Sequence, residues 1–360
     1  MVGALPVGSV ALVSFRLGGV DGVAVEAAKW AWALRSLGLS VTTVAGEGTA
    51  DRLLPGLAMQ AREPPAAVEV ADAVAGADVV VVENLCSLPV NAAAAGVVAR
   101  VLRGRRAILR HHDLPWQRAR LAHLPPPPDD PEWVHVTINA LSQRQLAERG
   151  LAASVVYNVF DPDPPAGARA ATRAALGLEG DRRLVLQPTR AILRKNVAAG
   201  IELAEALDAA YWVLGSAEEG YGPELDRLLR AATVPVVHGY PEAVLAVCGD
   251  APLPDVAHAY AATDAVALPS SWEGFGNPTV ESALHRRPLA IGSYPVATEL
   301  AGFGFRWFDA AEPASLRAWL DQPEAGLLDH NAAIARRHFS LHDLPGRLSR
   351  IMEQAGWRVA

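Results

Sequence analysis

The sequence predicts an α/β protein with two doubly wound parallel sheets, one in each of two domains. Three observations support this class. Short apolar runs typical of buried strands alternate with segments of helical length along the chain. A run of turn-forming residues over 161–167 interrupts this alternation. Strand and helix patterns then resume from residue 183. We therefore expect a first domain over 1–160 and a second over 161–339.

Composition narrows the class of protein further. The chain has 360 residues, 51% of them hydrophobic, which is enough for two packed domains. A net charge of −7 argues against a nucleic-acid partner. The two cysteines, Cys86 and Cys248, form no disulfide framework and fit a reducing cytoplasm. Residues 1–15 are apolar but lack a basic start and end at Arg16, so we interpret them as a core strand and not as a membrane span.

The first domain begins with a strand–loop–helix–strand unit. Apolar residues 9–14 are followed by Gly18 and Gly19, an amphipathic segment over 23–37, and a β-branched run over 40–44. This order opens a doubly wound sheet. The two glycines fit either a tight turn or a loop in which the backbone approaches a phosphate.

Polar residues follow three later strand patterns of this domain, over 78–83, 107–111 and 135–139. Open α/β sheets bind ligands at the carboxyl ends of their strands. The His-His-Asp triplet over 111–113 has side chains of the kinds that bind metals. The sequence offers no third ligand at a matching spacing, so we expect no metal. The residues at these ends are Glu83, Asn84, His111, His112, Asp113 and Asn139.

Five arginines crowd residues 100–110, at positions 100, 103, 105, 106 and 110. They could form a solvated helix end, or a patch for an anionic acceptor or a membrane surface. We favour the solvated helix end and keep weak peripheral membrane contact as the alternative.

The second domain opens with a strand over 183–187 and a basic loop that carries Arg190 and Lys195. A helix pattern starts at Asn196, so strand, basic loop and helix start together predict an anion site. An Asp-x-Asp over 161–163 lies in the proline-rich linker and not after a strand, and we reject it as a metal site.

The stretch over 270–281 carries the densest set of candidate residues. It follows an apolar strand pattern and contains Gly274 and Gly276. Asn277 has N-cap chemistry and Pro278 suits the first helical position, so we expect free N–H groups that favour an anion. Carboxylates accept hydrogen bonds from neighbouring hydroxyls, which suits a sugar or a ribose. Two of them, Glu273 and Glu281, flank this turn.

This stretch resembles the signature of retaining GT-B glycosyltransferases of family four. Seven residues separate Glu273 from Glu281, and the first six of them are Gly-Phe-Gly-Asn-Pro-Thr. The resemblance implies two Rossmann-like domains facing a central cleft, with a tail over 340–360 packing back on the first domain. It also implies metal-independent, retaining transfer of a hexose from a nucleoside-diphosphate sugar to a hydroxyl of a sugar, glycolipid or small molecule.

The resemblance assigns roles on the donor side. Arg190 and Lys195 would hold the diphosphate, Glu273 the sugar hydroxyls and Glu281 the ribose. The end of the strand pattern over 234–240 resembles the family's base-binding loop. The further donor-binding candidates are Gly18, Gly19, His238, Gly239, Tyr240, Gly274, Phe275, Gly276, Asn277, Pro278 and Thr279.

Other roles fall on the first domain. In the family a His-Asp or His-Gly pair faces the transferred sugar; His112 aligns best with it and His111 second. Acceptor-side candidates are Glu83, Asn84, Asp113 and Asn139. We expect GDP-mannose as donor, with UDP-glucose or UDP-GlcNAc as alternatives. Less favoured classes are a nucleotide-sugar epimerase, a sugar phosphorylase and a non-enzymatic binding module.

Overall fold

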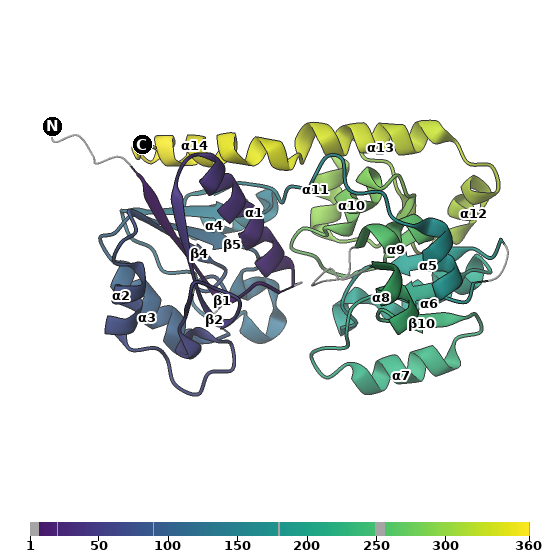
Figure 1. Cartoon of the computed structure of the whole chain (residues 1–360), viewed down its shortest axis with the longest axis horizontal. Coiled ribbons are helices and arrows are strands. Elements are labelled where there is room, and N and C mark those ends of the chain that lie inside the picture. The colour runs from purple at the N-terminus through teal and green to yellow at the C-terminus, as the bar shows by residue number, and fades with distance from the viewer. Residues whose placement is uncertain (1–6, 20, 89, 179–180, 249–255, 360) are drawn as a thin grey trace. The chain divides into compact units, whose positions relative to one another are not determined.

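The computed structural model describes residues 7–19, 21–88, 90–178, 181–248 and 256–359. The chain forms two compact units, which Figure 1 shows together and which are described here one at a time. Unit 1 comprises Met1–Val159 and Leu341–Ala360, and unit 2 comprises Phe160–Ser340. The strand expected within 1–15 begins at Ser9 in the described chain, and residues 1–6 lie outside the described residues.

Unit 1 is built on a sheet of seven strands, all parallel, in the order β3-β2-β1-β4-β5-β6-β7. The central strands β4 and β5 begin with apolar runs, residues 79–82 and 107–109, because both faces of the sheet are covered. The strands are β1 Ser9–Leu17, β2 Ser40–Gly48, β3 Arg52–Leu53, β4 Val79–Glu83, β5 Ala107–His111, β6 Trp133–Thr137 and β7 Ala153–Val155.

Helices cover both faces of this sheet. Val10 and Leu12 of β1 share a core with α1 and α14, whereas Ala11 and Val13 share one with α2 and α3. The alternation follows from the two-residue period of a strand. The helices are α1 Gly22–Ser36, α2 Ala67–Val74, α3 Ala92–Leu102, α4 Ala140–Ala147 and α14 Leu344–Gln354, with short 3-10 turns at Pro55–Leu57, Pro115–Gln117, Ala119–Leu121 and Leu341–Asp343.

The last helix of the chain belongs to unit 1. Helix α14 lies beside α1 (Figure 1), and Leu348, Met352 and Trp357 pack in the same core as Trp30 of α1. We expected the returning tail to span 340–360, and in the structure unit 1 takes up the chain again at Leu341. Phe339 lies in unit 2, where its ring packs edge-on against Phe275 with centroids 5.8 Å apart.

Unit 2 contains a parallel sheet of six strands in the order β10-β9-β8-β11-β12-β13. Pro235 directly precedes β10, an edge strand, so its missing N–H interrupts no ladder. The pattern over 305–308 yields a strand only at its end. The strands are β8 Leu184–Gln187, β9 Ala210–Val213, β10 Val236–His238, β11 Ala265–Leu268, β12 Leu289–Ile291 and β13 Phe308–Asp309.

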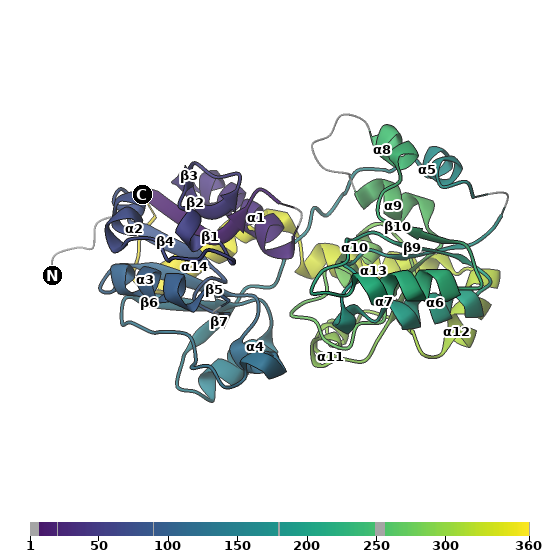
Figure 2. The same cartoon turned by 90° about the horizontal axis from the view of Figure 1, so that it is seen from below.

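Helices flank this second sheet as well. In Figure 2, α5, α8 and α9 lie on one side of the sheet and α6 and α7 on the other. Asp255, expected to start α9, lies outside the described residues. Within the described part of the chain, no helix is long and apolar enough to cross a membrane. The helices are α5 Arg169–Ala175, α6 Val197–Ala206, α7 Gly222–Ala231, α8 Glu242–Cys248, α9 Val256–Ala262, α10 Pro278–Leu284, α11 Pro295–Ala301, α12 Pro313–Asp321 and α13 Ala325–His338, with a 3-10 turn at Leu193–Lys195.

The packing of α14 predicts that Leu348→Ala destabilises unit 1. Leu348 is fully buried, so the change removes apolar contacts and leaves a cavity, at a cost of roughly 2–4 kcal/mol in the free energy of unfolding. Urea unfolding measures it. Arg350→Ala, at an exposed position of the same helix, should change stability by less than about 0.5 kcal/mol. Equal stability of the two variants would show that α14 adds nothing to this core.

Candidate active site

The loop between β11 and α10 is shaped by one glycine and one aromatic ring. Gly276 has φ +88°, and a Cβ there would lie 2.5 Å from the Tyr294 hydroxyl, so only glycine fits. Phe275 is buried, and its ring stacks on Phe160 with centroids 6.2 Å apart. Packing against Phe160 and Tyr294 therefore fixes the path of the loop's backbone.

The start of α10 differs from the expectation. Asn277 is itself in the α-helical conformation, with φ −45° and ψ −39°, and its side chain caps nothing. The N–H groups of residues 279–281 donate to the carbonyls of Gly276 and Asn277. Pro278 has no N–H to offer. The expected set of free N–H groups at 278–281 is absent, so an anion here depends mainly on side chains.

Those side chains come from the loop after β8. Lys195 and Glu273, both more than 90% buried, form an ion pair between the ammonium and one carboxylate oxygen. Arg194 donates to the other oxygen at 3.1 Å and to the carbonyl of Trp272 at 2.9 Å. Arg194 escaped the sequence analysis, although its place beside Lys195 was a usable signal.

Charge keeps this cluster ionised. Burial raises the pKa of the Glu273 carboxyl, but the Lys195 and Arg194 charges outweigh burial and hold it below its ordinary value. Burial lowers the pKa of the Lys195 ammonium, and the Glu273 carboxylate opposes that shift. Two cations against one acid leave one positive charge, which suits an anionic ligand.

Arg190 and Asn196 frame the same loop. Arg190 pairs with Glu218 at 2.6 Å and is half-exposed, and its charge is among those that lower the pKa of Lys195. Asn196 adopts a left-handed conformation, φ +51°, and its side chain accepts a hydrogen bond from the N–H of Ala199 at the start of α6. Asparagine tolerates this conformation better than most residues. It can therefore stand at a backbone position of the kind that usually favours glycine.

The other donor-side candidates of unit 2 lie in two separate groups. Glu281 accepts a hydrogen bond from the Tyr260 hydroxyl at 2.8 Å, a partner the sequence analysis missed. At the end of β10, the Gly239 carbonyl accepts from the Trp212 indole at 2.7 Å, and Tyr240 packs edge-on against that indole. Exposed His238 lies beside Gly239, with its Nε2 3.2 Å from the carbonyl oxygen of Gly215.

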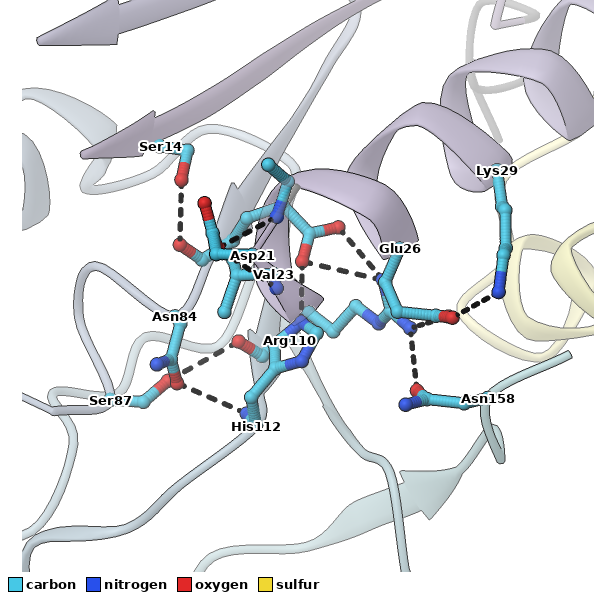
Figure 3. Close-up of polar contacts among 12 residues, drawn as sticks. Ser14, Asp21, Val23, Glu26, Lys29, Asn84, Ser87, Arg110, His112 and Asn158 are labelled. Atoms are coloured by element: carbon cyan, nitrogen blue, oxygen red, sulfur yellow. Dashed lines mark hydrogen bonds and ion pairs between the residues drawn. The ribbon is translucent and has the colours of Figure 1, made fainter. Parts of the chain in front are cut away.

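Unit 1 holds a buried ionic network at the carboxyl ends of β4 and β5 (Figure 3). Arg110 is fully buried and contacts Glu83 at 3.2 Å and Glu26 of α1 at 3.0 Å. Both expectations for this residue, a solvated helix end and a surface patch, are therefore wrong: its guanidinium is enclosed between two acids. His112 joins through Nε2, 2.8 Å from Glu83.

Asn84 ties the end of β4 to the end of β5. It has φ +57°, and its side-chain oxygen accepts from the N–H groups of His112 and Asp113 at 3.0 and 3.3 Å. Asp113 also pairs with Arg118 at 2.9 Å. The structure thus gathers Glu83, Asn84, His112 and Asp113 into one group.

Three candidates of unit 1 have structural explanations. Gly18 has φ +73°, and a Cβ there would clash with Thr49 at 2.6 Å; Gly19 follows it in the turn after β1. Asn139 is buried and caps α4 by accepting from the N–H of Ser142 at 2.6 Å. These contacts account for these residue types at these positions without invoking a ligand. Their roles in binding stay predictions.

His111 points to the other face of β5. Its Nδ1 lies 2.6 Å from the Ser87 hydroxyl and its Nε2 lies 2.8 Å from Nδ1 of His135. His135 Nε2 in turn meets Asp129 at 3.1 Å. Burial and the neighbouring His135 lower the pKa of His111 well below its ordinary value. Neutral His111 therefore belongs to a buried chain, separate from the Glu83–His112 contact.

No group of three or more His, Cys, Asp or Glu residues suited to a metal ion occurs among the described residues. Metal independence stays a prediction, because a nucleotide's phosphates can also supply ligands to a metal.

Comparison with known proteins adds the fold family. No protein-family model matches the chain. Mannosylglucosylglycerate synthase of Thermotoga maritima is 25% identical over 327 residues, which cover 76% of this chain and 75% of that protein. HepE of Anabaena, solved with UDP and glucose, superposes with a TM-score of 0.69 at 17% identity, covering 96% of this chain and 99% of HepE. A glycosyltransferase of Rickettsia africae superposes with a TM-score of 0.68 at 13% identity, covering 96% and 98%.

The two units, each built on a parallel sheet, have the GT-B fold of these neighbours. The relatives and these solved neighbours are glycosyltransferases, and this chain shares the fold of the neighbours.

The histidine chain predicts a loss of stability in mild acid. His111 and His135 have folded pKa values below their ordinary 6.5, in both cases chiefly through burial. Below about pH 6.5 the unfolded chain therefore binds protons that the folded chain resists, and the free energy of unfolding falls as pH falls. Each histidine contributes up to about 1.4 kcal/mol per pH unit. Urea unfolding at pH 7.5, 6.5 and 5.5 measures the slope.

A variant pair isolates this effect. His111→Phe keeps a ring of similar shape and should flatten the slope, whereas exposed His123→Gln should leave it unchanged. A wild-type slope that persists in His111→Phe would contradict a neutral buried His111.

Proposed function

We propose that the chain is a retaining glycosyltransferase that moves a hexose from a nucleoside-diphosphate sugar to an acceptor hydroxyl without a metal. The observation that carries this proposal is the cluster of Lys195, Arg194 and Glu273 beyond the carboxyl ends of β8 and β11. Ligands of open α/β sheets bind at such ends. A buried, net positive cluster beside a glycine loop suits a diphosphate attached to a sugar.

The cations of this cluster serve the diphosphate, and its carboxylate serves the sugar. The diphosphate carries two negative charges that grow on the leaving group as the sugar–phosphate bond breaks. Lys195 and Arg194 stabilise that charge in a site of low dielectric, where such contacts are strong. A carboxylate has about four acceptor positions. Glu273 uses one oxygen for each cation and keeps capacity for sugar hydroxyls.

A front-face reaction fits these residues. Double displacement needs a carboxylate nucleophile and a second carboxyl about 5 Å away. Around Lys195, Glu273 is the only acid paired with it in the described chain, and its oxygens are held by cations. The bond from the anomeric carbon to the phosphate oxygen breaks, and the acceptor oxygen bonds to the same face. The acceptor proton passes to the leaving phosphate oxygen.

For the substrates, we take GDP-mannose as the donor and UDP-glucose or UDP-GlcNAc as the alternative. The name of the Thermotoga relative describes mannose joined to glucosylglycerate, which supports a mannosyl donor and makes glucosylglycerate the first acceptor to test. The alternative is favoured by HepE, which was solved with UDP and glucose. A cytoplasmic location is part of the proposal, and the free thiols of Cys86 and Cys248 are consistent with it.

The test is direct. The purified chain is incubated with GDP-mannose, UDP-glucose or UDP-GlcNAc, each with and without glucosylglycerate. Nucleoside diphosphate release and the product's anomeric configuration are then measured. Acceptor-dependent release with retained configuration supports the proposal. Release without acceptor favours the epimerase class, and no release with any pair contradicts the transferase proposal.

Activity should survive metal removal, because Lys195 and Arg194 supply the charge that a divalent ion supplies elsewhere. Initial rates after exhaustive EDTA treatment are expected to stay within about twofold of untreated protein. Mg²⁺ added back is the control. Activity lost to EDTA and restored by Mg²⁺ would show that the reaction needs a metal.

Lys195→Ala should lower kcat/KM by roughly one to two decades, since a charge-assisted phosphate contact contributes about 1.5–3 kcal/mol. Lys195→Arg should restore only part of this, because a guanidinium has another shape. Arg227 of α7 is exposed and pairs with Glu224 of the same helix. Arg227→Ala is therefore the control and should keep wild-type turnover. Equal rates for Lys195→Ala and Arg227→Ala would remove Lys195 from the site.

A further inference from the structure

Glu83 makes contacts of two kinds with one carboxylate. Its register partner across the β4–β5 ladder is Arg110, whose guanidinium lies 3.2 and 3.4 Å from the two carboxylate oxygens. The second of these oxygens also lies 2.8 Å from Nε2 of His112. Glu83 is fully buried, and His112 keeps only 6% of its surface exposed. Figure 3 shows His112 beside Arg110 at the end of the strand.

We propose that Glu83 is a positioning residue that holds His112 in one ring orientation and one tautomer for the transfer reaction. This inference rests on the proposed function and on the family resemblance, which implies that His112 faces the transferred sugar. Glu83, which the sequence analysis predicted to lie on the acceptor side, would then act through His112 and not by direct contact with the acceptor.

The tautomer follows from the charge of Glu83. Burial raises the pKa of its carboxyl, but the Arg110 charge and the His112 hydrogen bond outweigh burial and lower it. An ionised carboxylate only accepts hydrogen bonds. Nε2 of His112 must therefore carry the proton, and Nδ1, for which the described chain offers no hydrogen-bond partner, is left for a ligand.

The backbone of His112 is held as firmly as its ring. The Asn84 side chain accepts its N–H at 3.0 Å and that of Asp113 at 3.3 Å. Glu83 and Asn84 are consecutive residues, so the end of β4 fixes both the ring and the main chain of His112. A histidine held at two points loses little freedom when a substrate binds, which is the advantage of a preorganised site.

Glu26 provides a matched control for Glu83. Both acids are fully buried and both pair with Arg110. Glu26 otherwise contacts Lys29 at 2.6 Å and makes no described contact with His112. Neutralising either acid disturbs the same guanidinium, but only the change at Glu83 replaces the charged acceptor of the His112 proton by a neutral amide.

The kinetic test compares Glu83→Gln, Glu26→Gln, His112→Ala and the Glu83→Gln/His112→Ala pair. Glu83→Gln is expected to lower kcat roughly 10- to 100-fold, as loss of an orienting partner does elsewhere, with the donor KM unchanged within about threefold. Glu26→Gln should keep kcat within about threefold even if it lowers the Tm as much. In the His112→Ala background, Glu83→Gln should cost no further activity. Equal losses for the two acids, or additive losses in the pair, would overturn the inference.

A second measurement needs no activity. Long-range ¹H–¹⁵N correlation of the wild-type His112 ring should show a proton on Nε2. Glu83→Gln should alter that signal and Glu26→Gln should not. A wild-type ring protonated only on Nδ1 overturns the inference whatever the kinetics. If no nucleotide sugar is turned over but the ring behaves as described, the proposed function fails while the positioning contact stands.

Discussion

The burial of Arg110 is the constraint on which unit 1 depends. A guanidinium removed from water is strongly destabilising unless acids surround it. Here the acids come from elements far apart in the chain, Glu26 from α1 and Glu83 from β4, and Arg110 lies 4.5 Å from the Trp30 ring centre. Its neighbour Asn158 adds a contact at 3.3 Å. These contacts fix α1 against the carboxyl end of the sheet, where the candidate residues lie.

Unit 2 also pairs a buried cation with a buried acid. Lys195 and Glu273 are 78 positions apart and meet beyond parallel strands. In both units a buried cation lies against a buried acid, and the Arg110–Glu83 and Lys195–Glu273 contacts each join two segments at the same edge of a sheet. The candidate chemistry thus gathers where strands end because the strands themselves are apolar and covered on both faces.

The sequence predicted what depends on local pattern and missed what depends on side-chain direction. Strands, helices and a glycine-containing loop before α10 follow from short-range periodicity and turn-forming residues. The opposite directions of Arg110 and His111 also follow from the two-residue period of β5, a signal that reading the arginines as one patch overlooked. Tyr260 and Glu26 were beyond reach, because nothing local links them to Glu281 or Arg110. The N-cap expectation failed since helical geometry already begins at Asn277.

The charge balance of the two units points to a division of labour. In unit 1, the charges of Arg110 and Lys29 balance those of Glu26 and Glu83. In unit 2, Lys195 and Arg194 exceed Glu273 by one charge. A diphosphate would therefore find its electrostatic complement in unit 2, whereas the network of unit 1 needs no ion from solution. Because His112 is not required as a counter-charge, its second ring nitrogen can serve a ligand without unbalancing the buried network.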